Sequence, residues 1–419
     1  MHPKDNDWPP KHRSREIIMN LGVSSAVSPI LKKLKLFIQE VVIPQEDNYN
    51  AQLSKNRWQV PAVMKELQSR AKHEGLFNLF IEKKAQTFDQ VDYAYLAEQM
   101  GYSEIAAEVF NCATPDSGNM EILARFGNDQ QRNDFLLPLL TGEVTSGFAM
   151  TEQAVASSDA TNINSHASLK DGTWRLNGEK TWIAGAGDPR FNFLMVMCVT
   201  ETDAVPERRQ SILLVPSDSP GVSITRMLPV FGYDNAPHGY AQIRFEDVEL
   251  PEDSLVGSPG QGFEIAQDRM GTGRIHQCMR SIGAAERALQ LMTHRAKNRF
   301  AFGKPLSELG GNVDIIANSR TEIEMSRLLA LRAAWALQQY GLEKALCEIA
   351  QMKVMVPNTA LNVIDRAIQM HGGTGVSADT PLARMWASHR TLRLSDGPDE
   401  VHRELIARIE FGQESLTYV

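Results

Sequence analysis

The stretch INSHASLKDGTWRLNGEKTWIAG, residues 163–185, decides the architecture of the middle of the chain. It places two pairs, Asp171-Gly172 and Asn177-Gly178, between short runs that alternate apolar and polar residues. Such pairs between alternating runs are the strongest local signal for a β-hairpin, because both residues accept the positive φ that a tight turn requires. Further β-rich runs follow at residues 193–199, 212–215, 222–225 and 241–245. We therefore predict a β-domain over residues 147–258.

Helical patterns precede this region. Residues 60–72 and 91–100 are long stretches that mix charged and apolar residues, and glycine or proline separates such stretches. This texture is typical of amphipathic helices. We predict an all-α N-terminal domain over residues 1–146, in which residues 1–24 are loosely ordered.

Helical periodicity returns after the β-domain. Apolar residues recur with the spacing of an amphipathic helix at Ile282, Ala285, Leu289, Met292 and Ala296. Long helices are also expected near residues 314–340 and 342–370, and Pro357 should kink the second unless it falls near a helix start. A last helix should begin after Gly397-Pro398, since proline suits a first helical turn. Four long helices with short connections predict a C-terminal four-helix bundle over residues 259–419.

Composition excludes several classes of protein. The 419 residues are 42% hydrophobic and 22% charged, which is enough apolar material for a substantial core. The net charge of −8 argues against nucleic-acid binding, which usually needs a concentrated basic surface. The four cysteines contain no CxxC pair, so we expect neither a disulfide framework nor a metal site. We find no signal peptide and no apolar window of about 20 residues, and we expect a cytoplasmic protein without a membrane span.

One glycine cluster, Gly372-Gly373-Thr374-Gly375, follows a long helical segment. Its backbone amides could approach a phosphate, but a helix C-cap followed by a turn is at least as good an explanation. The chain has no G-x-G-x-x-G after a strand and no G-x-x-x-x-G-K-[ST], so neither a Rossmann nor a P-loop site is supported.

Five strings in order give a stronger signal. They are FAMTEQAVASSDATNI (148–163), LNGEKTWIAGAG (176–187), NRFAFGKPL (298–306), QMHGGTGVS (369–377) and LSDGPDEVHRELIARIE (394–410). Together they resemble the acyl-CoA dehydrogenase superfamily over nearly the whole chain. The variants VASSDATN and DGPDEVH are most similar to the dehydrogenase domain of family members ten and eleven. The resemblance implies helical domains around a central β-barrel-like domain, bound FAD, and a homotetramer or homodimer that uses an electron-transferring flavoprotein as acceptor.

The resemblance also implies residue roles. Arg299 would reach the FAD pyrophosphate of a neighbouring subunit, where a guanidinium suits phosphate oxygens. FAD contacts are assigned to Phe148, Met150, Thr151, Ser157, Ser158, Trp182, Ile183, Ala184, Arg299, Gln369, Met370, His371, Gly372, Gly373, Pro398, Asp399 and Glu400. Acyl-CoA contacts are assigned to Ser158, Gly271, Thr272, Gly273, Arg274 and Gly397. Without the motifs around them, Phe148 and Trp182 would be interpreted as core residues.

The implied reaction is α,β-dehydrogenation of an acyl-CoA thioester to a trans-2-enoyl-CoA, in fatty-acid or related acyl-CoA catabolism. Asp396 matches the position of the base that removes the α-proton while hydride leaves for flavin N5. Taken alone, an aspartate before Gly-Pro is more often a turn residue or a helix N-cap. Some relatives carry the base at the position of Gly273, which cannot serve here.

Three departures from the family pattern keep alternatives open. Asp396 is shorter than the commoner glutamate, Ala184 lacks the hydroxyl that many members direct at flavin N5, and Gly310 stands where many have an FAD-contacting glutamine. An oxidase of the same superfamily, similar to nitroalkane oxidases with their aspartate base, is one alternative. A catalytically weak acyl-CoA- or FAD-binding protein is another.

Overall fold

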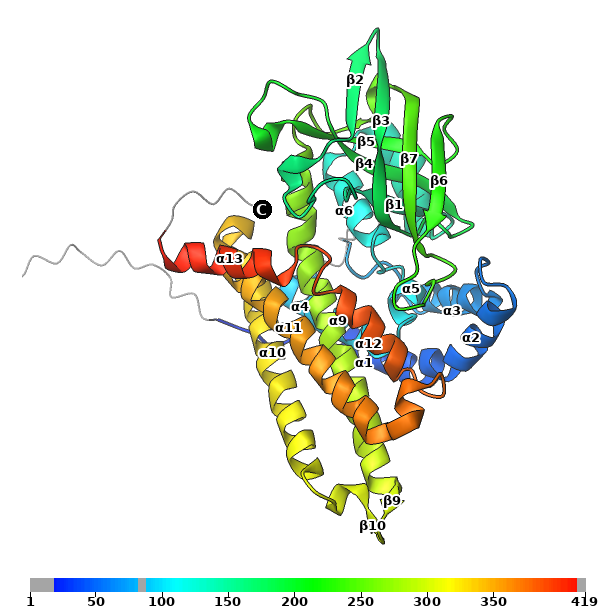
Figure 1. Ribbon diagram of the computed structural model, residues 1–419, viewed down its shortest axis with the longest axis vertical. Coiled ribbons are helices and arrows are strands. Elements are labelled where there is room, and N and C mark those ends of the chain that lie inside the picture. The colour runs from blue at the N-terminus through cyan, green and yellow to red at the C-terminus, as the bar shows by residue number, and fades with distance from the viewer. Residues whose placement is uncertain (1–18, 82–87, 413–419) are drawn as a thin grey trace, which may run out of the picture.

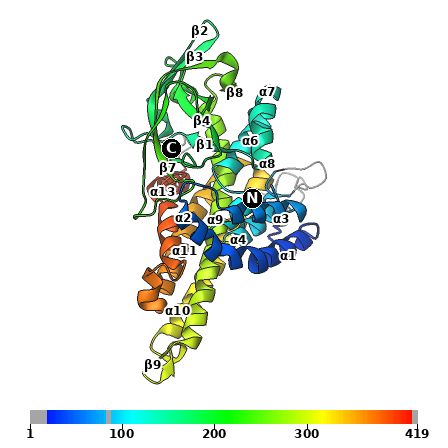
Figure 2. The same ribbon diagram turned by 90° about the vertical axis from the view of Figure 1, so that its right-hand side faces the viewer.

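The computed structural model describes residues 19–81 and 88–412, so the predicted loose order of residues 1–24 falls mostly outside the described residues. The sheet domain lies at one pole of the molecule, while the long C-terminal helices extend to the other pole (Figures 1 and 2). Among the described residues, no helix is long and apolar enough to cross a membrane. The predicted three-part architecture is confirmed.

The N-terminal domain is helical, as predicted. Its helices are α1 (Ser28–Phe37), α2 (Glu46–Lys55), α3 (Ala62–His73), α4 (Gln90–Met100), α5 (Ala106–Val109), α6 (Asp116–Phe126), α7 (Asp129–Gln131) and α8 (Leu137–Thr141). Local capping explains two of the starts. Asp89 accepts a hydrogen bond from the main-chain N–H of Asp92 at the start of α4, and Asn128 and Gln131 form a capping box at α7.

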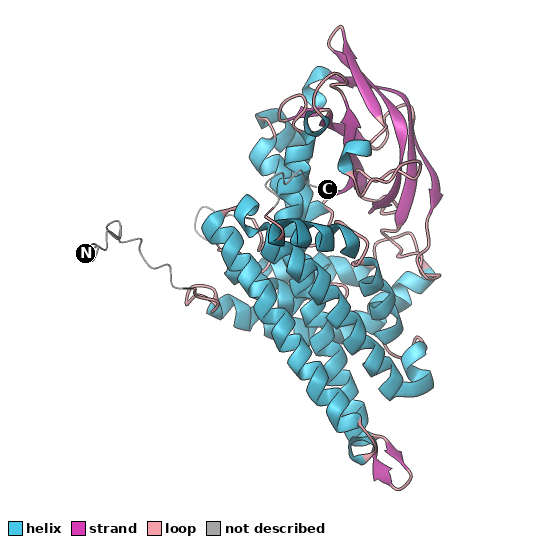
Figure 3. Cartoon of the chain, turned by 60° about the vertical axis from the view of Figure 1, so that its left-hand side comes forward, coloured by secondary structure: helices cyan, strands magenta, loops and turns pink. Residues whose placement is uncertain are grey.

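The central domain is one eight-stranded sheet (Figure 3). Its strands are β1 (Thr145–Ala149), β2 (His166–Lys170), β3 (Thr173–Ala184), β4 (Phe191–Val199), β5 (Gln210–Pro216), β6 (Val222–Met227), β7 (Tyr240–Pro251) and β8 (Leu255–Val256). The strand order is β6-β7-β3-β2-β4-β5-β8, and β1 pairs in parallel with β4. The β-rich runs predicted from the sequence all lie in strands.

Only one of the two predicted hairpin turns exists. Asp171 and Gly172 join β2 to β3 with φ of 51° and 76°, as a tight turn between antiparallel strands requires. The prediction for Asn177-Gly178 is wrong, because both residues lie inside β3. The pairing of β3 with β7 shifts register between Leu176 and Gly178, so this pair marks a β-bulge.

The C-terminal domain is helical, as predicted, and within the described residues it has three long helices and two short ones where four long helices were expected. They are α9 (Gly262–Asn298), α10 (Asn312–Tyr340), α11 (Leu342–His371), α12 (Leu382–Thr391) and α13 (Asp399–Glu410), and the small ribbon β9 (Phe300–Ala301) with β10 (Lys304–Pro305) follows α9. The periodic apolar residues of α9 are buried, as predicted. Pro357 lies inside the continuous α11, and the last helix begins directly after Gly397-Pro398.

Candidate functional site

The loop between α12 and α13 carries Asp396. This residue has φ of 54°, and Gly397 follows at 93°. A non-glycine residue in the left-handed region is uncommon, and such residues cluster at functional sites. Asp396 is not a helix N-cap, because α13 begins at Asp399 with Pro398 in the cap position. The structure therefore excludes the interpretation of Asp396 as a helix N-cap.

Two side chains from different helices hold the carbonyl oxygen of Asp396. Arg274 of α9 donates through Nε at 2.9 Å, and the Nε2 of His402 on α13 lies at 3.2 Å. Both side chains are buried. Burial, with the cation of Arg274 second, lowers the pKa of His402 to about 3, so its ring is neutral and its Nε2–H can donate to this carbonyl. Gly397 is required beside it, because a Cβ there would lie 2.8 Å from His402 Nε2.

The neighbouring carboxylates of this segment differ in role. Asp399 is buried and paired with Arg393, whose Nε lies 2.8 Å from its Oδ2, and Asn358 donates to the same oxygen at 3.1 Å. Its carboxylate is therefore engaged inside the protein, and only its backbone could contact a ligand. Glu400 is exposed in the first turn of α13.

Three of the residues predicted to contact the flavin lie on β3. Trp182 has φ of 60° and is 49% exposed, so core packing does not explain this tryptophan. Ile183 is buried, and Ala184 lies at the end of the strand. The main-chain N–H of Thr181 donates to the carbonyl of Thr151 at 2.9 Å, which joins β3 to the exposed segment after β1.

A buried ion pair fixes that segment. Lys180 Nζ lies 2.8 Å from Glu152 Oε1 and 2.9 Å from the carbonyl oxygen of Met150, and the Lys180 side chain is fully buried. Glu152 also accepts from the main-chain N–H groups of Asn164 and Ser165, at 2.9 Å each. The loop of residues 150–165 therefore folds around Glu152.

The other assigned residues of this segment differ in exposure. Phe148 is partly buried between two apolar clusters, with the guanidinium of Arg269 4.3 Å from its ring centroid. Ser157 Oγ accepts from the main-chain N–H of Glu152 at 2.8 Å, whereas Ser158 is exposed. Phe148 and Ser157 thus shape the segment, and Ser158 is free to meet a ligand.

The residues of α9 that were predicted to contact acyl-CoA do not all point in the same direction. A Cβ on Gly271 would lie 2.6 Å from Leu342, so this glycine packs against the start of α11. Thr272 directs its hydroxyl at Glu121, 3.3 Å away, while a Cβ on Gly273 would meet nothing within 4 Å. Gly273 and Arg274 are the members of this run best placed for a ligand near Asp396.

The residues predicted to contact the pyrophosphate and adenine half of FAD lie far from these groups. Arg299 is exposed just beyond α9, about seven turns or roughly 38 Å along the helix from Arg274. Gln369, Gly372 and Gly373 are exposed at the end of α11, whereas the side chains of Met370 and His371 are buried. Arg295 donates to the carbonyl of His371 at 3.4 Å, so the ends of α9 and α11 lie together. Gly372 caps α11 with φ of 65°, which confirms the C-cap interpretation of this glycine.

A cleft of about 950 Å³ lies next to the candidate site. Its lining includes Ala184 of β3, Leu392 in the segment that leads to Asp396, and Gln277 and Arg280 of α9. Residues 113–116 of the N-terminal domain also line it. The cleft is thus bounded by all three parts of the chain.

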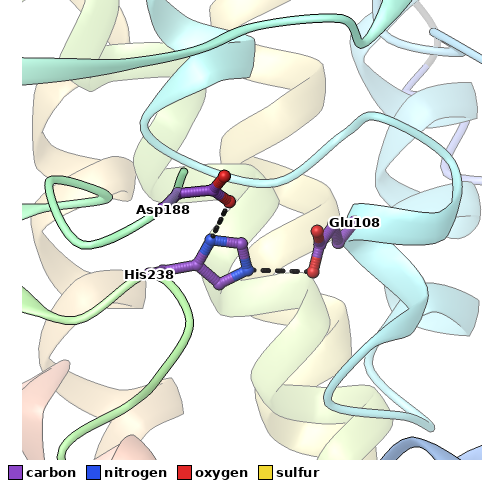
Figure 4. A group of neighbouring side chains, drawn as sticks. All are labelled: Glu108, Asp188 and His238. Atoms are coloured by element: carbon purple, nitrogen blue, oxygen red, sulfur yellow. Dashed lines mark hydrogen bonds and ion pairs between the residues drawn. The ribbon is translucent and has the colours of Figure 1, made fainter. Parts of the chain in front are cut away.

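A cluster of charged side chains, Glu108, Asp188 and His238, lies in the wall of this cleft and was not predicted from the sequence (Figure 4). The ring nitrogens of His238 lie 2.9 Å from Asp188 Oδ2 and 2.9 Å from Glu108 Oε2, and Arg190 pairs with both carboxylates. Burial opposes the charged ring, but Glu108 and Asp188 outweigh it and raise the pKa of His238 to about 10. The two cations already balance the two carboxylates, so the cluster joins α5 to the β-domain loops without needing a metal ion. The only local sequence signal for this cluster is the short spacing of Asp188 and Arg190. Glu108 and His238 are distant in the sequence, so their contact could not be predicted.

Comparisons with known proteins assign most of the chain to the same family. Three family models match in order: "Acyl-CoA dehydrogenase, N-terminal domain" at residues 28–143, "middle domain" at 147–248 and "C-terminal domain" at 260–410. The chain is 47% identical to the Mycobacterium tuberculosis protein "Probable acyl-CoA dehydrogenase FadE2", over 96% of this chain and 99% of that one.

Mouse acyl-CoA dehydrogenase family member 10 is 46% identical over 97% of this chain, and human family member 11 is 44% identical over 92%. The match spans only 39% and 50% of those longer relatives. The solved "Structure of a putative acyl-CoA dehydrogenase from Mycobacterium abscessus" is 43% identical, with a TM-score of 0.90 over 94% of this chain and 100% of that one. Butyryl-CoA dehydrogenase of Megasphaera elsdenii, 23% identical with a TM-score of 0.79 over 94% of this chain and 100% of that one, shares the fold. This chain belongs to the acyl-CoA dehydrogenase family.

Proposed function

We propose that this protein catalyses FAD-dependent α,β-dehydrogenation of an acyl-CoA thioester, in fatty-acid or related acyl-CoA catabolism in the cytoplasm. One observation carries the proposal. Asp396 is held in a left-handed turn by Arg274 and His402, in a loop that adjoins the cleft at Leu392. A carboxylate whose backbone is fixed by two buried side chains, in a segment that lines the cleft at Leu392, suits a general base.

The residues present fit FAD, provided that two chains contribute. Trp182 offers a half-exposed indole and Thr151 an exposed hydroxyl on the β-domain side. Arg299 and the exposed Gly372 and Gly373 offer a cation and open backbone on the adenine side. These two sets lie at opposite ends of α9, so we propose that a second copy supplies the adenine side in a homodimer or homotetramer. FAD, when bound, would supply the acceptor for the β-hydride.

In the proposed mechanism the chain performs three tasks. Asp396 takes the α-proton of the thioester, and its own main-chain N–H donates to the thioester oxygen, where negative charge develops. Arg274 keeps the peptide of Asp396 in place through its carbonyl oxygen. Ser158, exposed beside the β-domain loop, would bind the CoA portion. The cleft beyond Gln277 would receive the acyl chain and exclude water from the base.

We further propose that an electron-transferring flavoprotein, and not oxygen, reoxidises the enzyme. The support is Trp182, whose exposed indole lies on the surface of β3, where a partner could approach. The competing function is an oxidase with a small neutral substrate, which the aspartate base also allows. Stoichiometric hydrogen peroxide at the rate of substrate turnover would favour that oxidase.

The decisive experiment mixes the purified holoenzyme anaerobically with butyryl-CoA, isobutyryl-CoA, octanoyl-CoA, palmitoyl-CoA and nitroethane. Bleaching of the flavin by one of the CoA esters, with formation of the 2-enoyl-CoA, is the expected result. Bleaching by nitroethane alone would support the oxidase. If neither nitroethane nor any ester of a wider panel bleaches the flavin, the protein is a binding protein and the proposed reaction is wrong.

A further inference from the structure

A buried lysine lies beside the loop that carries Asp396. Lys353, in the middle of α11, is 1% exposed. Its ammonium donates to the main-chain oxygens of Leu392 at 2.5 Å and of Ser395 at 2.9 Å. Both acceptors belong to the segment between α12 and α13, so this side chain connects the core of the bundle to that segment.

Packing alone does not explain a lysine at this position. Moving an ammonium out of water is costly, and an apolar side chain of similar length would avoid that cost. Burial accordingly lowers the pKa of Lys353 below its ordinary value. The hydrogen bonds to Leu392 and Ser395 are the compensation that the structure shows. A side chain that can donate is therefore needed to hold these two carbonyl oxygens.

Lys353 completes a set of three donors from three helices. Arg274 of α9 and His402 of α13 hold the carbonyl oxygen of Asp396, and Lys353 of α11 holds those of Leu392 and Ser395. Together they fix the chain immediately before and at the left-handed residue. Because an aspartate reaches less far than a glutamate, its carboxylate depends more strongly on where this backbone lies.

We propose that Lys353 is a positioning residue for the catalytic base. Its two hydrogen bonds set the turn from which the Asp396 carboxylate reaches the α-carbon of the substrate. Misplacement by about 1 Å can cost roughly 10²-fold in rate, which is the scale expected when this constraint is lost. The inference rests on the proposed role of Asp396 as base.

The test compares Lys353→Met, which keeps the length but cannot donate, with Lys353→Gln and Lys353→Arg, which can donate. Lys344→Met is the matched control, since Lys344 is an exposed lysine of the same helix. We expect Lys353→Met to lower the limiting rate of anaerobic flavin reduction about 10- to 100-fold. The half-saturating concentration of the fastest CoA ester of the panel should change little. Glutamine or arginine should recover part of the rate, and Lys344→Met should behave as wild type.

A second measurement separates positioning from a general loss of structure. Substrate deuterated at the α-carbon should show a larger isotope effect in Lys353→Met, because proton removal becomes slower relative to the other steps. Amide hydrogen exchange should accelerate in residues 392–398 and stay unchanged in α9. The inference is overturned by wild-type rates in a folded Lys353→Met protein. An unchanged isotope effect, or failure of the methionine and glutamine variants to fold, would also overturn it and make Lys353 a structural residue.

A separate variant tests the proposed function independently of Lys353. Asp396→Asn is measured in parallel, and normal flavin reduction in that variant would reject Asp396 as base whatever Lys353 does. An inactive Asp396→Asn protein beside a fully active Lys353→Met protein would reject only the inference about Lys353.

Discussion

At the scale of single residues, backbone conformation bears on the choice of base. Asn and Asp enter the left-handed region more readily than other non-glycine residues. Asp396 has φ of 54°, so the turn itself favours aspartate over the longer glutamate that is commoner in this family. The shorter side chain is thus consistent with a loop whose shape is fixed by its surroundings.

The first prediction concerns this base. Asp396→Asn keeps the shape and the preference for the turn but removes the proton acceptor, so flavin reduction should fall about 10²- to 10⁴-fold. FAD content and Tm should stay close to wild type. Stopped-flow anaerobic bleaching measures the rate, and calorimetry measures the Tm. Asp396→Glu should be partly active, since its longer side chain starts from a backbone set for aspartate.

Near-normal bleaching by Asp396→Asn would move the base elsewhere. Asp399 is then a poor candidate, because it is buried against Arg393 and Asn358. The exposed Glu400 would be examined next.

The second prediction concerns pH. His238 has an ordinary pKa of 6.5 that is raised to about 10 in the folded protein, so its contribution to stability is complete below pH 6.5. That contribution should disappear as the pH rises from 6.5 through 10. The Tm of wild type should therefore fall across this window more steeply than the Tm of His238→Asn. His166→Asn, a change at an exposed histidine of β2, is the control and should follow wild type. Parallel curves for wild type and His238→Asn would contradict the assigned charge.

At the scale of elements, the sequence predicts strands and long helices well because their periods are local. The prediction of hairpin turns is less accurate, because two similar dipeptides adopt different structures. Asp171-Gly172 forms a hairpin turn. Asn177-Gly178 instead forms a β-bulge within β3, because β3 continues to pair with β7 on both sides of it. Pro357 likewise lies within α11 without dividing it. Neither outcome is encoded locally, since both depend on the partner element.

The third prediction concerns the loop after β1. Lys180→Met breaks a buried ion pair and leaves the Glu152 carboxylate buried without its cation, which typically costs about 3–5 kcal/mol in unfolding free energy. Because this pair organises residues 150–165, FAD retention on a desalting column should fall as well. Lys170→Met, at an exposed position of β2, should change neither property. Full FAD retention in a destabilised Lys180→Met protein would separate the pair from the cofactor segment.

The candidate site was predictable only in part. Asp396 and Arg299 were identified through resemblance, since an aspartate before Gly-Pro or an arginine in a basic stretch is ordinary on its own. Lys353 and the cluster around His238 have no local signature. They become visible only when helices distant in the sequence bring donors and acceptors together.

At the scale of the whole molecule, the fourth prediction tests whether one site uses two chains. Arg299→Ala should weaken FAD binding by roughly 1.5–3 kcal/mol through loss of a charge-assisted contact, and equilibrium dialysis measures this. Mixed assemblies of Arg299→Ala and Asp396→Asn chains should regain activity. One site of each mixed pair would then combine an intact Asp396 with an intact Arg299. At an FAD concentration that leaves Arg299→Ala assemblies empty, a 1:1 mixture should reach roughly a quarter of wild-type activity if pairs form at random.

No recovery in mixtures shown to exchange subunits would mean that Arg299 does not act on a neighbour's site. Holo-monomers that keep FAD on a sizing column would have the same meaning.

The unbroken length of α9 has one more consequence. A single helix from Gly262 to Asn298 separates the two sets of candidate FAD residues, and no hinge within it would let one chain fold back on its own cofactor. Specific activity should therefore depend on enzyme concentration. Dilution below the dissociation constant of the assembly should yield apoprotein that regains activity on reconcentration with FAD, so assays of dilute enzyme would report subunit association as much as chemistry.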